Sequence, residues 1–281
     1  MDRQQREQWR RELSVRGAAA EALGERFCAE MDFVEGLAGL HASRAASWRR
    51  LAAKAGQIVR DAASAGRQDR LARAVAEAEK VLAPVAKVAK GYTIHCVGHA
   101  HIDMNWMWSW PETVAVTNDT FTTVLKLMDE FDDFCFTQSQ ASVYEIVHRY
   151  NPPLLEAIAR RVAEGRWEVA VEHWVEGDKN LASGESLARH LLYSRRRMKE
   201  LFGLEVEDLS LDWEPDTFGH ARTIPTIVAR GGVKRYYMCR GGAWDKPPVF
   251  WWAGPDGERI LVNLETTWYN GVIAPANATA L

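Results

Sequence analysis

The chain has 281 residues, of which 47% are hydrophobic and 26% are charged, and its formal net charge is -3 at pH 7. This balance is typical of a globular protein with a buried core, and it gives no electrostatic reason to expect nucleic acid as the main partner. Residues 1–12 are charged, and no stretch approaches the roughly 18 apolar residues of a membrane helix, so we expect neither a signal peptide nor a membrane partner. The four cysteines are scattered singly, which favours thiols in a reducing compartment and therefore the cytosol.

Residues 1–90 contain a single proline and a single histidine among many Ala, Arg and Glu residues, a composition that favours helix. An apolar residue recurs there every three or four positions, as on one face of a helix, at Leu71, Val75, Ala78 and Leu82. We therefore predict two or three helices that pack on the domain that follows. Four aromatic residues require burial and argue against a solvated coiled arm: Trp9, Phe27, Phe33 and Trp48.

From residue 92 onward, strand-like and helix-like segments alternate, and we take residues 91–281 as one α/β domain. We predict strands at 92–98, 134–138, 167–172, 208–213, 234–239 and 259–264, and helices near 114–130, 153–164, 185–202 and 223–230. The helix from 185 follows a Ser-Gly pair that is a plausible cap. Such alternation predicts a parallel sheet, open or closed into a barrel, with its active site at the carboxyl ends of the strands.

The first motif, Gly98–Asp103, directly follows the apolar run 92–97. If that run is a strand, His99, His101 and Asp103 project from the same side. Two imidazoles and a carboxylate form half of a divalent metal site, in which His99 either binds the ion or orients another ligand. Three tryptophans follow within seven residues, and Trp106 is nearest to the candidate ligands.

The second motif, Asp212–His220, follows another strand-like run and places Asp216 at a second strand end. Asp216 can complete a ligand set with His101 and Asp103. A carboxylate beside a metal ion stays ionised, which also suits a nucleophile. The alternative is a turn capped by Asp216 with no catalytic role.

Other polar residues carry weaker signals. The acidic residues of Glu172–Asp178 either contact a polyhydroxylated substrate or cap the next helix. Arg240 follows the fifth strand and offers a cationic donor near the site, whereas we expect the basic run 195–199 to be a solvated helix face. Three further histidines are expected to be structural or to support ligands: His173, His190 and His220.

Taken together, these motifs resemble glycoside hydrolase family 38, the α-mannosidases, over roughly residues 92–265. Six matching stretches fall in the family's order, which makes the resemblance specific. They are Gly98–Asp103 with Trp106 and Trp108, Ser139–Gln140, Gly165–Glu168, Trp174–Glu176 with Asp178, Ser183–Leu187, and Pro215–Gly219.

The resemblance implies a retaining, zinc-dependent hydrolase of α-mannosides, with the ion at the floor of a seven-stranded β/α barrel of the glycoside hydrolase and deacetylase type. The second His and the Asp of the first motif bind zinc in that family, which carries over to His101 and Asp103. The Asp of the second motif is both zinc ligand and nucleophile, which carries over to Asp216.

For the sugar, the resemblance implies that Trp106 packs under the ring and that Phe218 and Arg240 line the −1 subsite. The family's fourth zinc ligand and its general acid come from later in the barrel, so we expect an incomplete barrel here. The expected partner is an α-mannoside oligosaccharide or glycan of undetermined linkage, and an oligomer is compatible with the sequence. Two alternatives remain open: a metal-dependent polysaccharide deacetylase, and a sugar-binding fragment without activity.

Overall fold

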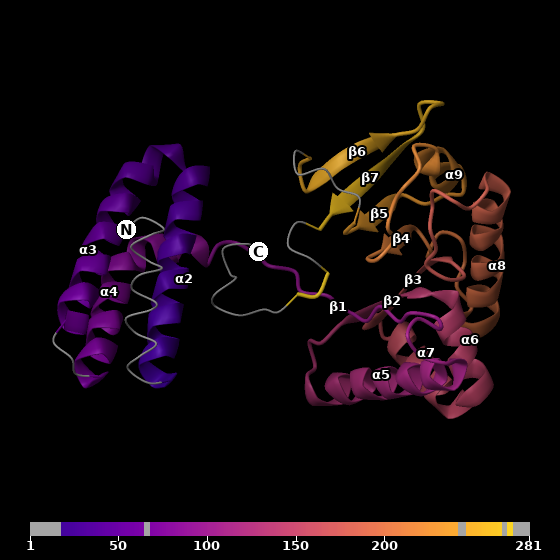
Figure 1. The fold of residues 1–281 in the computed structure, drawn as a ribbon, viewed down its shortest axis with the longest axis horizontal. Helices are drawn as coiled ribbons and strands as arrows, with labels where there is room; N and C mark the ends of the chain where they lie inside the picture. Colours follow the sequence, from indigo (N-terminus) through magenta and orange to yellow (C-terminus); the bar gives the residue numbers. More distant parts are fainter. Residues whose placement is uncertain (1–17, 65–67, 241–245, 266–268, 272–281) are drawn as a thin grey trace. The chain divides into compact units, whose positions relative to one another are not determined.

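The computed structural model describes residues 18–64, 68–240, 246–265 and 269–271. These residues form two compact units, the first ending at His95 and the second running over Cys96–Asn270 (Figure 1). None of the helices in the described part of the chain is both long and apolar enough to cross a membrane.

The described residues of the first unit form three helices: α2 (Ala18–Leu40), α3 (Ala42–Ser64) and α4 (Gln68–Ala89). Their apolar faces meet in a single core that contains Phe27 and Trp48. The apolar stripe predicted on the third helix is confirmed, since all four of its residues are buried. Phe33 packs partly buried against the same core, and Trp9 lies outside the described residues.

The second unit alternates strands and helices. Its strands are β1 (Gly98–His99), β2 (Phe136–Gln140), β3 (Trp167–His173), β4 (Leu211–Glu214), β5 (Arg235–Met238), β6 (Val249–Ala253) and β7 (Arg259–Leu264). Its helices are α5 (Trp110–Glu130), α6 (Ala141–Tyr150), α7 (Pro152–Ala163), α8 (Gly184–Phe202) and α9 (Ile224–Arg230). The predicted parallel α/β organisation is confirmed for all strands except β6, which pairs antiparallel with β7.

The expected seven-stranded barrel is not what the described residues form. They contain seven strands in two sheets, ordered β1-β2-β3 and β4-β5-β7-β6. Strand β6 lies at the edge of the second sheet and pairs antiparallel with β7. The parallel order of a β/α barrel is therefore not continued at this edge. The fold is therefore α/β with two sheets.

The strand predicted at 92–98 is wrong over most of its length. Only Gly98 and His99 pair, with Phe136 and Thr137 of β2. The preceding residues are largely exposed, with Ile94 at 54%. The reason is that the ladder of the neighbouring strand begins only at Phe136, so the earlier residues have no partner there. Their apolar character therefore does not lead to a strand.

Two separate cores hold the sheets to their helices. Phe136 and Trp167 of the first sheet pack with Phe121 of α5 and Tyr144 of α6, and the Trp167 indole donates to the Tyr144 hydroxyl at 2.8 Å. Helices α8 and α9 cover the second sheet through a different cluster that includes Tyr236. The loop after β1 is anchored in the first core by Ile102, which is 3% exposed.

Helix α8 begins where the sequence predicted it. Ser183 has extended backbone angles, and its hydroxyl accepts a hydrogen bond from Ser186 N at 3.2 Å. The helix ends at Gly203, whose φ of 71° is left-handed and suits glycine. This fixed start anchors the loop that follows β3.

Candidate metal and active site

The loops after β1 and β4 bring His101, Asp103 and Asp216 together. One ligand atom from each lies within 4.8 Å of the others. His101 Nε2 is 3.1 Å from Asp103 Oδ1 and 3.8 Å from Asp216 Oδ2. These are the three residues that sequence analysis proposed as ligands. They lie on loops that follow strands of different sheets. We call these three residues the metal group.

The metal group offers ligand atoms that could hold a divalent metal ion. One imidazole nitrogen and two carboxylates are ligand types that Zn²⁺ accepts. The side chains of His101 and Asp216 are 12% and 15% exposed, so the group is sheltered and still reachable. In the metal-free protein, burial lowers the pKa of His101, but Glu176 and Asp103 raise it to about 9.

Glu176, in the loop after β3, connects the metal group to its surroundings. Its Oε2 is 2.8 Å from His101 Nδ1, and its Oε1 accepts from Asp216 N at 2.5 Å and lies 3.2 Å from Thr217 Oγ1. A carboxylate behind a histidine ligand fixes the ring and directs the other nitrogen at the ion. Sequence analysis had placed Glu176 as a substrate contact or helix cap. Its position three residues beyond another parallel strand was the only signal for this role.

Two glutamines of β2 hold the loops in place. Gln140 accepts from Glu176 N at 3.0 Å and donates to Ile102 O at 2.8 Å, while Gln138 donates to Ala100 O at 2.9 Å. Both glutamines thus hydrogen-bond the loop after β1, and Gln140 also connects that loop to Glu176. These bonds fix the backbone on which His101 stands.

His99 lies apart from the metal group. Its Nδ1 is 3.0 Å from Thr137 O, and its ring lies 5.3 Å from that of Trp213. Burial lowers the pKa of His99 to about 3, which keeps it neutral. The structure therefore places His99 outside the group of candidate ligands.

The residues expected to bind sugar gather beside Asp216. Arg240 Nε donates to Asp216 Oδ1, and its guanidinium lies 4.6 Å from the Phe218 ring centroid. Tyr269, which sequence analysis did not single out, has its ring 6.3 Å from that of His101 and hydrogen-bonds with Asp216 and Arg240.

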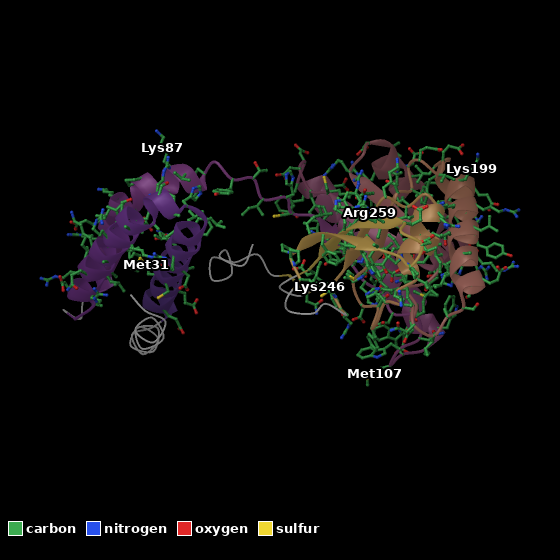
Figure 2. The ribbon with its side chains drawn as sticks, turned by 90° about the horizontal axis from the view of Figure 1, so that it is seen from above. Met31, Lys87, Met107, Lys199, Lys246 and Arg259 are labelled. Atoms are coloured by element: carbon green, nitrogen blue, oxygen red, sulfur yellow. The ribbon has the colours of Figure 1, made fainter. Side chains whose placement is uncertain are left out.

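Trp106 belongs to the exposed part of the loop after β1, near Met107, which projects from the surface (Figure 2). Its ring is 64% exposed and meets Trp108 edge-on at 5.4 Å. The Trp108 indole donates to Asp103 O at 3.3 Å, which ties this aromatic pair to a ligand of the metal group.

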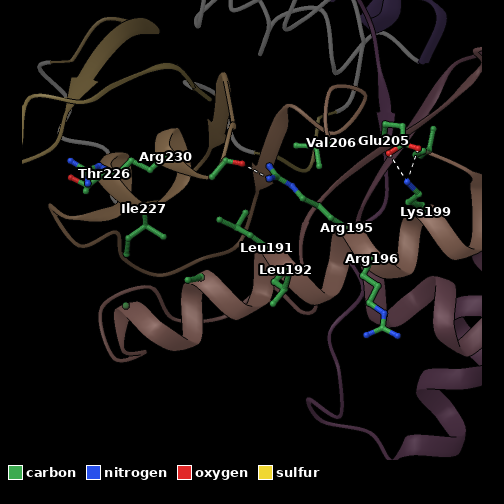
Figure 3. A pocket seen from close by; sticks show the side chains of 14 residues that line it. Leu191, Leu192, Arg195, Arg196, Lys199, Glu205, Val206, Thr226, Ile227 and Arg230 are labelled. Atoms are coloured by element: carbon green, nitrogen blue, oxygen red, sulfur yellow. Dashed lines mark hydrogen bonds and ion pairs between the residues drawn. The ribbon is translucent and has the colours of Figure 1, made fainter.

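The expected solvated basic face on α8 is wrong for Arg195. Its guanidinium makes two hydrogen bonds to Glu172, at 2.7 and 2.8 Å, and is only 12% exposed. The reason is its position on the side of α8 that faces β3, whereas Arg196 is 75% exposed as predicted. A groove of about 820 Å³ runs over this part of α8 toward α9 (Figure 3), and the residues that line it are not those of the metal group.

Comparison with known proteins identifies the class to which this fold and site belong. Residues 91–279 match the family described as "Glycosyl hydrolases family 38 N-terminal domain", and the chain belongs to that family. It is 35% identical over 175 residues to Alpha-mannosidase G of Dictyostelium discoideum, covering 60% of this chain and 16% of the relative. It is 34% identical over 177 residues to Alpha-mannosidase 2C1 of Mus musculus, covering 61% and 17%.

Among solved structures, the fold resembles an alpha-mannosidase from Enterococcus faecalis V583 with a TM-score of 0.56 and 24% identity. That match covers 62% of this chain and 20% of the other. The chain thus spans about one sixth of the curated relatives that it matches.

Removing the Glu176 carboxylate should loosen His101 and weaken metal binding. We expect Glu176→Ala to lower the affinity for Zn²⁺ by about 10–100-fold, the usual effect of losing such a partner. Isothermal titration calorimetry measures the affinity, with Glu168→Ala as control, because Glu168 is an exposed carboxylate on β3, the strand before the Glu176 loop. Equal affinities for wild type and Glu176→Ala would contradict the bridging role.

Metal binding should also release a proton from His101. The pKa near 9 means that this imidazole is protonated at neutral pH, whereas a ligand must be neutral. Raising the pH from about 6 to about 7.5 should therefore increase the apparent Zn²⁺ affinity, by roughly tenfold per unit for one proton. Titrations in buffers of different ionisation enthalpy count that proton; a flat profile without release would contradict the expectation.

Proposed function

We propose that this chain is part of a zinc-dependent retaining α-mannosidase, with His101, Asp103 and Asp216 as zinc ligands. The observation that supports it most is the convergence of these residues, from loops of two different sheets, beside Arg240. Membership of family 38 and the named α-mannosidase relatives favour a terminal α-mannoside as substrate. The cytosol is the proposed location, because the four cysteines form no disulfide.

In this proposal, Asp216 is the nucleophile. Arg240 donates a hydrogen bond to Oδ1 of Asp216, and Oδ2 of Asp216 faces His101. Asp216 attacks the anomeric carbon, a bond forms to the carboxylate, and the glycosidic oxygen leaves with a proton from a second carboxyl group. Water then hydrolyses the glycosyl ester and the configuration is retained. Bound zinc would supply positive charge that keeps Asp216 ionised and holds sugar hydroxyls.

The surroundings of Asp216 suit this task. Its backbone N–H is fixed by Glu176, so the carboxylate starts from a constrained position. Phe218, 72% exposed beneath the Arg240 guanidinium, and the exposed Trp106 ring offer apolar surface for the carbon face of a sugar. We assign these three side chains to substrate binding.

The nucleophile is tested by trapping. A 2-deoxy-2-fluoro mannosyl fluoride should form an adduct at Asp216, identified by peptide mass spectrometry, and Asp216→Asn should cut turnover of an aryl α-mannoside below about one thousandth. Both are measured with zinc, in this chain and in any longer chain that contains it. A metal-dependent deacetylase would form no adduct, and retained activity of Asp216→Asn would refute the assignment.

The role of Trp106 is tested by truncation. If the indole stacks on the sugar, Trp106→Ala should weaken substrate binding by about 1–3 kcal/mol. Met107→Ala is the matched control, since its side chain is 80% exposed on the same loop. Calorimetric titration with an α-mannoside gives the values, and an unchanged dissociation constant for Trp106→Ala would remove the residue from the site.

A further inference from the structure

A second cluster of charged residues is buried behind the metal group, where β3 meets β4. Lys179 Nζ is 2.9 Å from Asp212 Oδ2 and also contacts Glu214 Oε1. His173 Nδ1 is 2.9 Å from Asp212 Oδ1 and 3.0 Å from Glu214 Oε1. None of the four side chains is more than 6% exposed. We call these four residues the buried ion cluster.

Its two carboxylates and its histidine could in principle ligate an ion, since their ligand atoms lie within 4.8 Å of one another. The ammonium group of Lys179, however, already contacts both carboxylates. Burial lowers the pKa of Lys179, but Asp212 and Glu214 outweigh it and raise that pKa well above its ordinary value. Lys179 is therefore charged. Burial lowers the pKa of His173, but Glu214 and Asp212 raise it to about 10, so the two buried carboxylates face two cations, of which Lys179 is one.

The buried ion cluster is joined to the metal group by hydrogen bonds. Glu214 Oε2 accepts from Thr217 Oγ1, and that hydroxyl also lies 3.2 Å from Glu176 Oε1. Glu176 in turn contacts His101 and the backbone of Asp216.

The backbone carries a parallel link. Lys179 and His220 form an isolated β-bridge between the loop after β3 and the loop after β4. Lys179 also follows Glu176 by three residues, and Thr217 directly follows Asp216. The side-chain and backbone connections therefore join the same two loops.

We propose that Lys179 is a positioning residue: its ammonium group acts as a built-in cation that holds Glu214 and, through the hydroxyl of Thr217, fixes the backbone that carries Asp216 of the metal group. The proposal rests on the proposed function only in that it takes the metal group as the site served. Without the ammonium group, Asp212 and Glu214 would be two buried carboxylates facing His173 alone. One of them would then take up a proton or turn away, and Thr217 would lose its acceptor.

The site is suited to chemical rescue. A cavity of about 130 Å³, lined by Lys179, His173 and Asp212 among others, adjoins the ammonium position. Replacing Lys179 with alanine enlarges this space, so that methylammonium can enter and restore the missing cation. Methylammonium carries the same charge and has three N–H donors, as the lysine head group does.

The experiment compares Lys179→Ala with wild type in this chain. Zn²⁺ affinity should fall by about tenfold or more and recover partly with methylammonium, but not with an equal concentration of sodium. In the metal-free protein, hydrogen exchange over residues 214–220 should accelerate and slow again with methylammonium. Lys199→Ala, which removes an exposed lysine paired with Glu205, should change neither quantity.

The outcomes separate this inference from the proposed function. A folded Lys179→Ala variant with wild-type zinc affinity and wild-type exchange would overturn the inference. If wild type bound no zinc, the proposed function would fail, and the exchange measurement would still decide the role of Lys179. If Lys179→Ala did not fold, Thr217→Val, which cuts the link and keeps the buried ion cluster, takes its place. Unchanged exchange over 214–220 in that variant would also overturn the inference.

Discussion

The arrangement of the site depends on the Glu176 carboxylate. One of its oxygens lies against the His101 imidazole, and the other accepts a hydrogen bond from the Asp216 amide. The side chain is almost entirely buried, with 3% exposure, so water cannot substitute for these partners. A single group therefore contacts both the His101 side chain, on a loop of one sheet, and the Asp216 backbone, on a loop of the other.

The sequence alone could indicate the metal group because each of its residues is marked by the sequence pattern directly before it. His101, Asp103 and Asp216 each follow a strand-like run by a few residues, and carboxyl ends of parallel strands converge in space. These three residues converge even though the first strand is only two residues long. What mattered was the position of the loop, which Gln138 and Gln140 fix from the neighbouring strand.

The supporting contacts could not be predicted, since they join residues far apart in the sequence. Nothing near Glu176 indicates that His101, 75 residues earlier, lies against it. The prediction that Arg195 is solvated is wrong for a similar reason. Its partner Glu172 belongs to β3, which only tertiary packing brings next to α8. The seven-stranded barrel, expected to be incomplete in this chain, is not confirmed, and the antiparallel pairing of β6 with β7 is likewise a non-local feature.

The division of the second unit into two sheets has a consequence for folding. His101 and Glu176 stand on loops of the first sheet, whereas Asp216 and Arg240 stand on loops of the second. Each half can gain most of its hydrophobic stabilisation from its own core. The cluster of ligand atoms, however, exists only after the two halves dock, so the native state should be the only species on the folding pathway with high metal affinity, and an ion would stabilise the docked state by mass action.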